Sequence, residues 1–297
     1  MAKVIITGGT GLVGKRLTAL LTANGYEVNI LSRHPKDKNE YQWDVHANFI
    51  DEQVFENATA IIHLAGAGIA DRRWTEARKK EILISRIKPI QLIYDYLSTH
   101  PHFIDTFISA SAVGYYGDRK EEVLTEDSAN GKGFLAEVCK AWEEEADRLA
   151  SLNILVSKVR TGIVLSKDGG ALPKLDFPIR LGIGAYIGDG AQYVPWIHID
   201  DICSMYLHLL GKKITGAFNG CAPGIKTNLQ MSETIAKVLH RPFIPLPAPA
   251  IILKTILGEM SSMLLMSDNC SSQKIRTTGF EFRYPTLEDA LQEIYSR

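Results

Sequence analysis

The stretch Val4-Ile5-Ile6-Thr7-Gly8-Gly9-Thr10-Gly11-Leu12-Val13-Gly14 decides the fold of this chain. The apolar run at residues 4–6 predicts a strand that is buried on both faces, as strands of parallel sheets are. A glycine-rich turn follows, and from Leu12 onward the apolar residues recur at helical spacing. A strand, a tight turn and a helix in this order are typical of the first unit of a dinucleotide-binding domain.

The glycines of this turn fit two versions of the dinucleotide fingerprint, Gly9-x-Gly11-x-x-Gly14 and Gly8-x-x-Gly11-x-x-Gly14. One glycine permits the turn, one lets backbone N–H groups approach a pyrophosphate, and one lets the helix pack closely on the strand. The positive end of the helix dipole then faces the phosphates. We therefore expect a dinucleotide to contact Gly8, Thr10, Gly11, Leu12, Val13 and Gly14.

The second predicted strand, residues 27–31, ends at Ser32-Arg33. In NAD-binding domains an acidic residue near this position binds the ribose 2′-hydroxyl. A guanidinium beside a hydroxyl suits a 2′-phosphate instead, because arginine binds phosphate through two parallel hydrogen bonds. The pair favours NADP over NAD, and a solvated arginine at the end of a strand is the alternative.

Strand and helix patterns alternate through the first 160 residues, which indicates βαβ units and a doubly wound parallel sheet of the Rossmann type. Later strands are expected at 60–66, 103–110 and 154–160, long helices at 75–97 and 134–150, and a helix at 231–239 capped by Asn228 or Ser232. Beyond residue 160 the pattern loosens into glycine-rich and proline-rich segments. We predict a Rossmann domain of residues 1–165 plus about 194–240, and a smaller, mostly helical substrate-side domain of about 166–193 plus 241–297.

The composition is that of an ordinary globular protein, with 45% hydrophobic residues, 23% charged residues and a net charge of -1. This charge gives no reason to expect nucleic acid or an anionic membrane as a partner. The four cysteines are widely separated, so neither a zinc site nor a disulfide framework is indicated, and we expect no metal. We expect a cytoplasmic protein with a small-molecule substrate, and the oligomeric state stays open.

Two further stretches end or follow predicted strands at the carboxyl edge of the sheet, where doubly wound folds bind ligands. Leu64-Ala65-Gly66 offers small residues against which a cofactor can lie, and a buried strand with a glycine stop is the alternative. Ser111 and the loop residues Tyr115 and Tyr116 follow the next strand. A serine and a tyrosine near a nicotinamide can polarise and protonate a carbonyl, although an ordinary strand and aromatic loop would look the same.

The chain resembles an extended, atypical short-chain dehydrogenase/reductase, and more closely the sugar-nucleotide epimerase-like subfamily with a small C-terminal domain of unknown role. The resemblance covers nearly the whole chain and rests on residues 7–14, 63–68, 73–74, 85–86, 109–117, 134–143, 160–165, 169–171, 196–201, 222–223, 240–242, 258–260 and 279–285. It implies an NADP-binding Rossmann domain. By this likeness Glu81, Arg86 and Val164 would also line the cofactor groove.

One departure from the superfamily concerns Tyr-x-x-x-Lys, in which the tyrosine moves the proton and the lysine lowers its pKa and holds the ribose. The corresponding helix offers Lys140, but Ala136 stands four residues before it. Lys140 either touches the ribose or lies on the surface. Proton transfer would then fall to Tyr115 or Tyr116, with Ser111 holding the carbonyl. His198 with Asp200-Asp201 is an alternative acid/base group or a structural joint.

Two functions remain open on the sequence. The first is an NADP-dependent oxidoreductase or epimerase that transfers hydride to or from a small polar substrate such as a nucleotide sugar; the serine strand and tyrosine loop favour it. The second is a regulatory or scaffold protein that binds NADP but has lost Tyr-x-x-x-Lys, which the missing tyrosine favours. A serine hydrolase is not favoured, because the sequence has no Gly-x-Ser-x-Gly elbow.

Overall fold

An eight-stranded sheet forms the centre of the computed structural model, which describes residues 2–296. All neighbouring strands are parallel except β3 and β4. In spatial order the strands are β14 (Gly216–Gly220), β8 (Leu155–Thr161), β6 (Thr106–Ala112), β5 (Ala58–His63), β1 (Lys3–Thr7), β2 (Glu27–Ser32), β3 (Glu40–Asp44) and β4 (Phe49–Ile50). The predicted Rossmann-type parallel sheet is confirmed.

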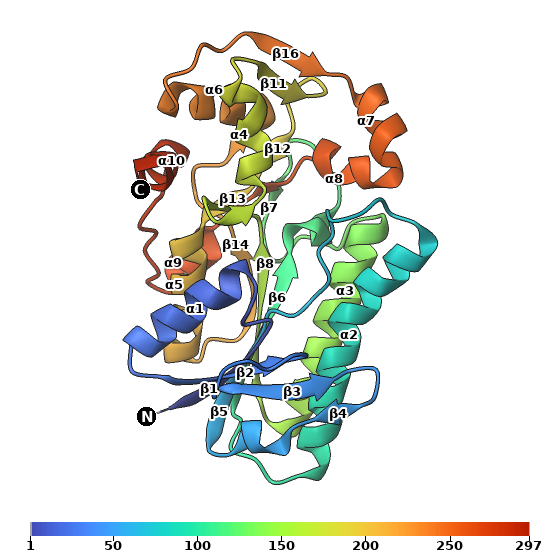
Figure 1. The fold of residues 1–297 in the computed structure, drawn as a ribbon, viewed down its shortest axis with the longest axis vertical. Coiled ribbons are helices and arrows are strands. Elements are labelled where there is room, and N and C mark those ends of the chain that lie inside the picture. The colour runs from blue at the N-terminus through green and yellow to red at the C-terminus, as the bar shows by residue number, and fades with distance from the viewer. Residues whose placement is uncertain (1, 297) are drawn as a thin grey trace.

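Helices cover both faces of this sheet, because successive side chains of a strand point to opposite faces (Figure 1). Val4 and Ile6 of β1 lie in a cluster with α1 (Leu12–Ala23) and α5 (Ile199–Lys212). Ile5, between them, lies in a second cluster with α2 (Glu76–Thr99) and α3 (Phe134–Asp147). All three β1 side chains are fully buried, as the apolar run of the sequence predicts.

The strand order reverses direction between β1 and β5, which is the topological switch point where such folds bind ligands. Here the glycine turn comes close to the end of β5. A Cβ on Gly8, whose φ is +73°, would lie 2.9 Å from the backbone nitrogen of Ala65. A Cβ on Gly14 would collide with the carbonyl oxygen of Gly8. Both positions therefore require glycine for the turn to reach this place.

A second lobe lies above the sheet in Figure 1 and has its own apolar cluster around the buried Trp196. Its main helices are α4 (Leu172–Arg180), α6 (Asn228–Val238) and α10 (Leu287–Ser296). The remaining elements are β7 (Val123–Leu124), β9 (Ile163–Ser166), β10 (Gly169–Gly170), β11 (Gly184–Ile187), β12 (Tyr193–Val194), β13 (Trp196–His198), β15 (Lys226–Thr227), β16 (Pro245–Ala248), α7 (Ala250–Leu257), α8 (Ser262–Leu265), β17 (Asn269–Cys270), α9 (Gln273–Thr277) and short 3-10 turns.

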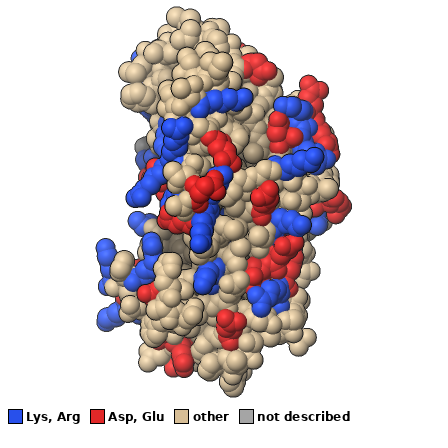
Figure 2. Space-filling view, turned by 90° about the vertical axis from the view of Figure 1, so that its right-hand side faces the viewer, with Lys and Arg blue, Asp and Glu red and all other residues tan. Residues whose placement is uncertain are grey.

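The surface of this second lobe carries few charged side chains on the face shown in Figure 2, whereas the lower part of that face mixes both signs of charge. The helix α7 has no buried residue, and its Ile251 is 76% exposed. Within residues 2–296, no helix combines the length and the apolar character that crossing a bilayer requires.

Two sequence predictions of local structure need correction. The strand expected at 103–110 begins only at Thr106, and Phe103 lies in the preceding loop with 71% of its surface exposed. The helix expected at 231–239 begins at Asn228, because Thr227 caps it: its hydroxyl accepts from the Gln230 backbone, and the Gln230 side chain accepts from the Thr227 backbone. The division into two domains stays a prediction.

Candidate functional site

The N-terminus of α1 is the part of the glycine turn best suited to an anion. Gly11 is its N-cap, so no side chain caps the helix, and its first turn contains no acidic residue. The Gly11 backbone nitrogen donates to the Gly8 carbonyl at 3.0 Å, which closes the turn. The next N–H groups of the helix are left to satisfy a ligand or solvent, and the dipole favours a negative charge there.

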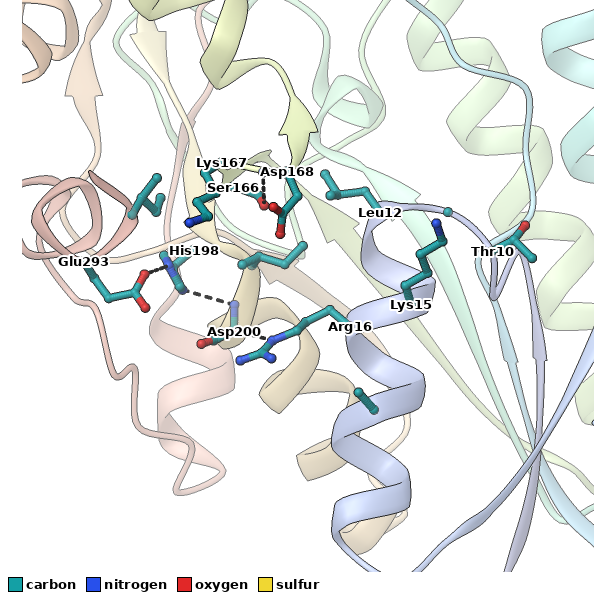
Figure 3. Close-up of a pocket in the computed structure, with 14 residues that line it drawn as sticks. Thr10, Leu12, Lys15, Arg16, Ser166, Lys167, Asp168, His198, Asp200 and Glu293 are labelled. Carbon is teal, nitrogen blue, oxygen red and sulfur yellow. Dashed lines mark hydrogen bonds and ion pairs between the residues drawn. The ribbon is translucent and has the colours of Figure 1, made fainter. Parts of the chain in front are cut away.

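A cavity of about 560 Å³ opens beside this helix start (Figure 3). Of the predicted cofactor contacts, Thr10, Gly11 and Leu12 line it, and none of the predicted catalytic residues does. Charged side chains from four segments make up much of the rest, namely Lys15, Arg16, Lys167, Asp168, Asp200 and Glu293. Apart from Asp200, the sequence offered no signal for this set, because its members come from segments far apart along the chain.

The hairpin of β9 and β10 stands over the first turn of α1. A Cβ on Gly170 would lie 3.3 Å from the Leu12 side chain and 3.3 Å from the carbonyl of Val164. Val164 is partly buried and packs against the cluster that contains α1. The structure thus brings Val164 and Leu12, which are both predicted cofactor contacts, to the same edge of the site.

The end of β5 is fastened to the end of β1 by a buried pair of side chains. The hydroxyl of Thr7 lies 2.7 Å from Nδ1 of His63 and also accepts from the Ala65 backbone nitrogen at 3.2 Å. Burial and the nearby Arg86 charge lower the pKa of His63 to about 3, so the ring stays neutral. These bonds set the path of Leu64-Ala65-Gly66 along the carboxyl edge.

Ser32 and Arg33 lie at the carboxyl end of β2, as the NADP prediction requires. The Ser32 hydroxyl accepts from the His34 backbone nitrogen at 3.3 Å. Arg33 is exposed, and no carboxylate of residues 2–296 forms an ion pair with it. Its guanidinium is therefore available to an anion from outside the chain.

The long helix α2 carries Glu81 and Arg86, whose side chains differ in their exposure to solvent. The Glu81 carboxylate is more than half exposed and pairs with Arg78 at 2.7 Å, which lowers the pKa of Glu81. Arg78 also donates to the carbonyl of Gly68, so the pair anchors the loop after β5. Arg86 is half-buried instead, with its guanidinium carbon 5.1 Å from the centre of the Trp142 ring.

Ser111 belongs to a buried polar network. Its hydroxyl donates to Oε1 of Glu143 at 2.7 Å. The Glu143 carboxylate also accepts hydrogen bonds from Nε and Nη2 of Arg160 at 2.8 and 2.9 Å. Sequence reasoning missed Glu143 and Arg160, although both fall in stretches that it singled out. The signal is their position: Glu143 lies one helical turn after Cys139 on the buried side of α3, and Arg160 follows the buried Val159 in β8.

The two tyrosines of the loop after β6 differ in their access to solvent. The Tyr116 side chain is fully buried, its hydroxyl donates to Asn219 at 2.6 Å and accepts from Arg160 at 2.9 Å, and burial raises the pKa of its phenol. Tyr115 is partly exposed, and the centre of its ring lies 3.5 Å from the guanidinium carbon of Arg160. Tyr115 is the better placed of the two to meet a substrate.

Lys140 lies on the outer side of α3, where it is 56% exposed and forms a loose 3.8 Å ion pair with Glu144. The side of α3 that faces the serine loop carries Leu135 and Cys139 instead: a Cβ on Gly114 would lie 3.2 Å from Leu135 and 4.0 Å from the Cys139 sulfur. Leu135 packs in an apolar cluster, and burial raises the pKa of the Cys139 thiol to about 12. Leu135 and Cys139, which lie four residues apart on the side of α3 that faces the serine loop, are thus both apolar.

His198, Asp200 and Asp201 each make structural contacts. His198 accepts from the Asp200 backbone at the start of α5 and bonds to Glu293 of α10 at 3.0 Å. Asp200 pairs with Arg16 of α1 at 2.6 Å. Asp201 is buried and accepts from the backbone nitrogens of Arg283 and Tyr284 at 2.8 and 3.0 Å. This arrangement favours the structural alternative, in which these residues fasten the C-terminal segment to the Rossmann helices.

The comparison with known families decides the relationship. The profile of the NAD dependent epimerase/dehydratase family matches residues 4–152, and a domain of unknown function, DUF1731, matches residues 248–294. The chain belongs to the NAD dependent epimerase/dehydratase family. The resemblance inferred from the sequence is confirmed, and the expected cofactor class agrees with that of the family.

Members of this epimerase/dehydratase family from distant organisms match the whole chain. Epimerase family protein YfhF of Bacillus subtilis is 36% identical over 298 residues, which cover 98% of this chain and 97% of that protein. The crystal structure of human epimerase family protein SDR39U1 with NADPH has a TM-score of 0.90 and 33% identity, and covers 99% of both chains. UDP-glucuronic acid 4-epimerase of Bacillus cereus has a TM-score of 0.78 at 16% identity over 99% of this chain and 98% of that chain, which shows the shared fold alone.

Proposed function

We propose that this chain binds NADP(H) across the carboxyl edge of β1 and β5, with the 2′-phosphate on Ser32 and Arg33. The observation that carries this proposal is the pairing of an uncapped helix start at Gly11 with an exposed Arg33 that no carboxylate of residues 2–296 neutralises. An uncapped helix start suits a pyrophosphate, and a free guanidinium suits a phosphate monoester. The human relative whose structure contains NADPH supports the assignment.

In this proposal the pyrophosphate lies on the turn from Gly8 to Gly14, and Thr10, Leu12 and Val13 flank it. Leu64, Ala65 and Gly66 carry the middle of the cofactor, and Val164 closes the edge beside Leu12. Glu81 and Arg86 lie on the α2 side of the groove. The nicotinamide of the bound cofactor would supply or accept a hydride.

We infer that this site works without the proton relay of short-chain dehydrogenases. The α3 positions that face the serine loop are Leu135 and Cys139, and the thiol of Cys139 is held protonated by burial. Ser111 donates to Glu143, and the Tyr116 hydroxyl is enclosed by Arg160 and Asn219. These contacts support a cofactor-binding role, regulatory or scaffolding, as the function the geometry favours.

A second candidate is an oxidoreductase or epimerase that acts on a small polar substrate such as a nucleotide sugar. One observation favours it: Tyr115 is partly exposed, and its ring lies against the Arg160 guanidinium, so a phenol is available at the end of β6. The family description favours it as well. The nucleotide sugar itself rests on likeness of fold, which does not determine a substrate.

Titration of the protein with NADPH and with NADH tests the cofactor assignment. Because charge-assisted hydrogen bonds to the 2′-phosphate would be lost, Arg33→Ala should weaken NADPH binding by about tenfold or more and NADH binding by less than about twofold. Lys36→Ala is the matched control, since Lys36 is also exposed and lies three residues along the same loop. Equal losses for the two cofactors in Arg33→Ala would contradict the 2′-phosphate assignment.

A further inference from the structure

Arg86 differs from the other interior arginines in lacking a counter-ion. Arg160 is buried against both oxygens of Glu143, and Arg78 is paired with Glu81. The Arg86 guanidinium donates to the carbonyl of Ile82, on its own helix, at 2.9 Å, and no carboxylate of residues 2–296 forms an ion pair with it. Burial lowers the pKa of Arg86, as does the neighbouring charge of Arg78. A desolvated cation without an anion is costly unless a ligand uses it.

The guanidinium of Arg86 lies at the carboxyl end of β5. A Cβ on Gly66, three residues beyond that strand, would lie 3.2 Å from its central carbon. In a doubly wound domain, the half that contains β1 to β3 receives the adenosine, so β5 and β6 face the nicotinamide half of a dinucleotide. Arg86 therefore stands on the nicotinamide side of the switch point.

Arg86 also neighbours the face of α3 on which a proton-relay lysine would be expected. The charge of Arg86 acts on the thiol of Cys139, which faces the serine loop one turn after Leu135. Trp142, on the following turn, forms the surface under the guanidinium at 5.1 Å. Position 139 of α3 carries no positive charge. Arg86 of α2 thus supplies a positive charge beside this position.

We propose that Arg86 replaces the missing lysine of α3 and makes the site selective for the reduced cofactor, NADPH, over NADP⁺. The inference rests on the proposed NADP(H) site. The nicotinamide ring of NADP⁺ carries a positive charge, whereas that of NADPH is neutral. A fixed guanidinium at the edge of a partly buried groove repels the charged ring and not the neutral one, and this repulsion is stronger there than in water.

The same reasoning explains why Cys139 is not lysine. A lysine at position 139 would place a second cation beside Arg86, and like charges in a poorly solvated site repel each other. Cys139→Lys should therefore lower the free energy of unfolding. Combining it with Arg86→Gln should recover part of this loss, because a single cation then remains.

The experiment compares the dissociation constants of NADPH and NADP⁺ by calorimetry in the full chain. Wild type should bind NADPH about tenfold or more tighter than NADP⁺, Arg86→Gln should bring the ratio to within about threefold, and Arg86→Lys should keep it. Lys88→Gln is the control, because Lys88 lies on the same helix with an exposed side chain. It should leave both constants unchanged.

Each outcome is decisive. Equal affinities in wild type, or an Arg86→Gln variant that loses both cofactors in equal proportion, would overturn the selectivity inference and leave the cofactor site intact. If wild type binds neither cofactor, the proposed function itself fails. If Arg86→Gln does not fold, the wild-type ratio and Arg86→Lys still decide, since equal wild-type affinities, or a ratio that Arg86→Lys abolishes although it keeps the positive charge, would contradict the inference.

Discussion

Glu143 and Arg160 meet in a two-pronged ion pair inside the protein, with Oε1 2.8 Å from Nε and Oε2 2.9 Å from Nη2. Their side chains are only 7% and 5% exposed. The pair gathers Ser111 and Tyr116 around it, so two of the side chains predicted to be catalytic are held in a network that joins β6, α3 and β8.

Removing the charge from this pair should destabilise the fold strongly. Glu143→Gln leaves Arg160 buried without its counter-ion, and breaking a buried pair in this way costs about 3–5 kcal/mol. Urea denaturation should show the loss in the free energy of unfolding. Glu144→Gln is the matched control, because Glu144 is exposed and only loosely paired with Lys140, and it should change stability by less than about 0.5 kcal/mol. Similar losses in the two variants would contradict the structural role.

The two tyrosines should differ in their effect on stability when each is changed to phenylalanine. Tyr116→Phe removes a hydroxyl that is bonded to Arg160 and Asn219, so it should lower the free energy of unfolding by about 1–3 kcal/mol. Tyr115→Phe should leave stability almost unchanged. If the chain is an oxidoreductase that uses Tyr115, this variant should also lose most of any NADP⁺-dependent oxidation of UDP-glucuronic acid, the trial substrate, in which a sugar hydroxyl gives hydride to the nicotinamide and its proton to Tyr115. Retained turnover would remove Tyr115 as the acid/base group.

Lys140→Ala should have little effect on cofactor binding. Since Lys140 is 56% exposed on the outer side of α3, the dissociation constant of NADPH should change by less than about twofold, and the free energy of unfolding by less than about 0.5 kcal/mol. Fluorescence titration and urea denaturation measure the two quantities. A tenfold weaker binding of NADPH would instead support the alternative that Lys140 contacts the ribose of the cofactor.

His63 should make stability depend on pH. Its pKa is lowered to about 3 in the fold and is about 6.5 in the unfolded chain, so between these values the unfolded state binds the extra proton. The free energy of unfolding therefore falls as pH falls from about 6.5 toward 3. His63→Asn should be less stable at pH 7, but its stability should fall by about 2 kcal/mol less between pH 7 and pH 5.

Denaturation at the two pH values tests this contribution. His34→Asn is the control, because His34 is exposed and should keep the wild-type pH dependence. If His63→Asn and wild type lose equal stability between pH 7 and pH 5, the buried neutral histidine is not the cause.

The sheet and most of its helices could be predicted because their signals are local. Strands buried on both faces give continuous apolar runs such as residues 4–6 and 60–64, and a glycine fingerprint combines turn geometry and close packing in a few residues. Element ends were less predictable, as the Thr227 cap and the late start of β6 show. Such ends depend on hydrogen bonds between neighbouring side chains and backbone, which propensity alone does not rank.

The sequence by itself determined the Rossmann core, the family and the end of the sheet at which a dinucleotide is expected. Only the tertiary structure decided the surroundings of the reactive side chains. Lys140 was the natural candidate by residue type, but the 3.6-residue repeat of α3 turns Leu135 and Cys139 inward and Lys140 outward. Likewise, Ser111, Glu143 and Arg160 are far apart in sequence and meet only when β6, α3 and β8 pack, because pairing between buried charges is set by three-dimensional packing rather than by local sequence.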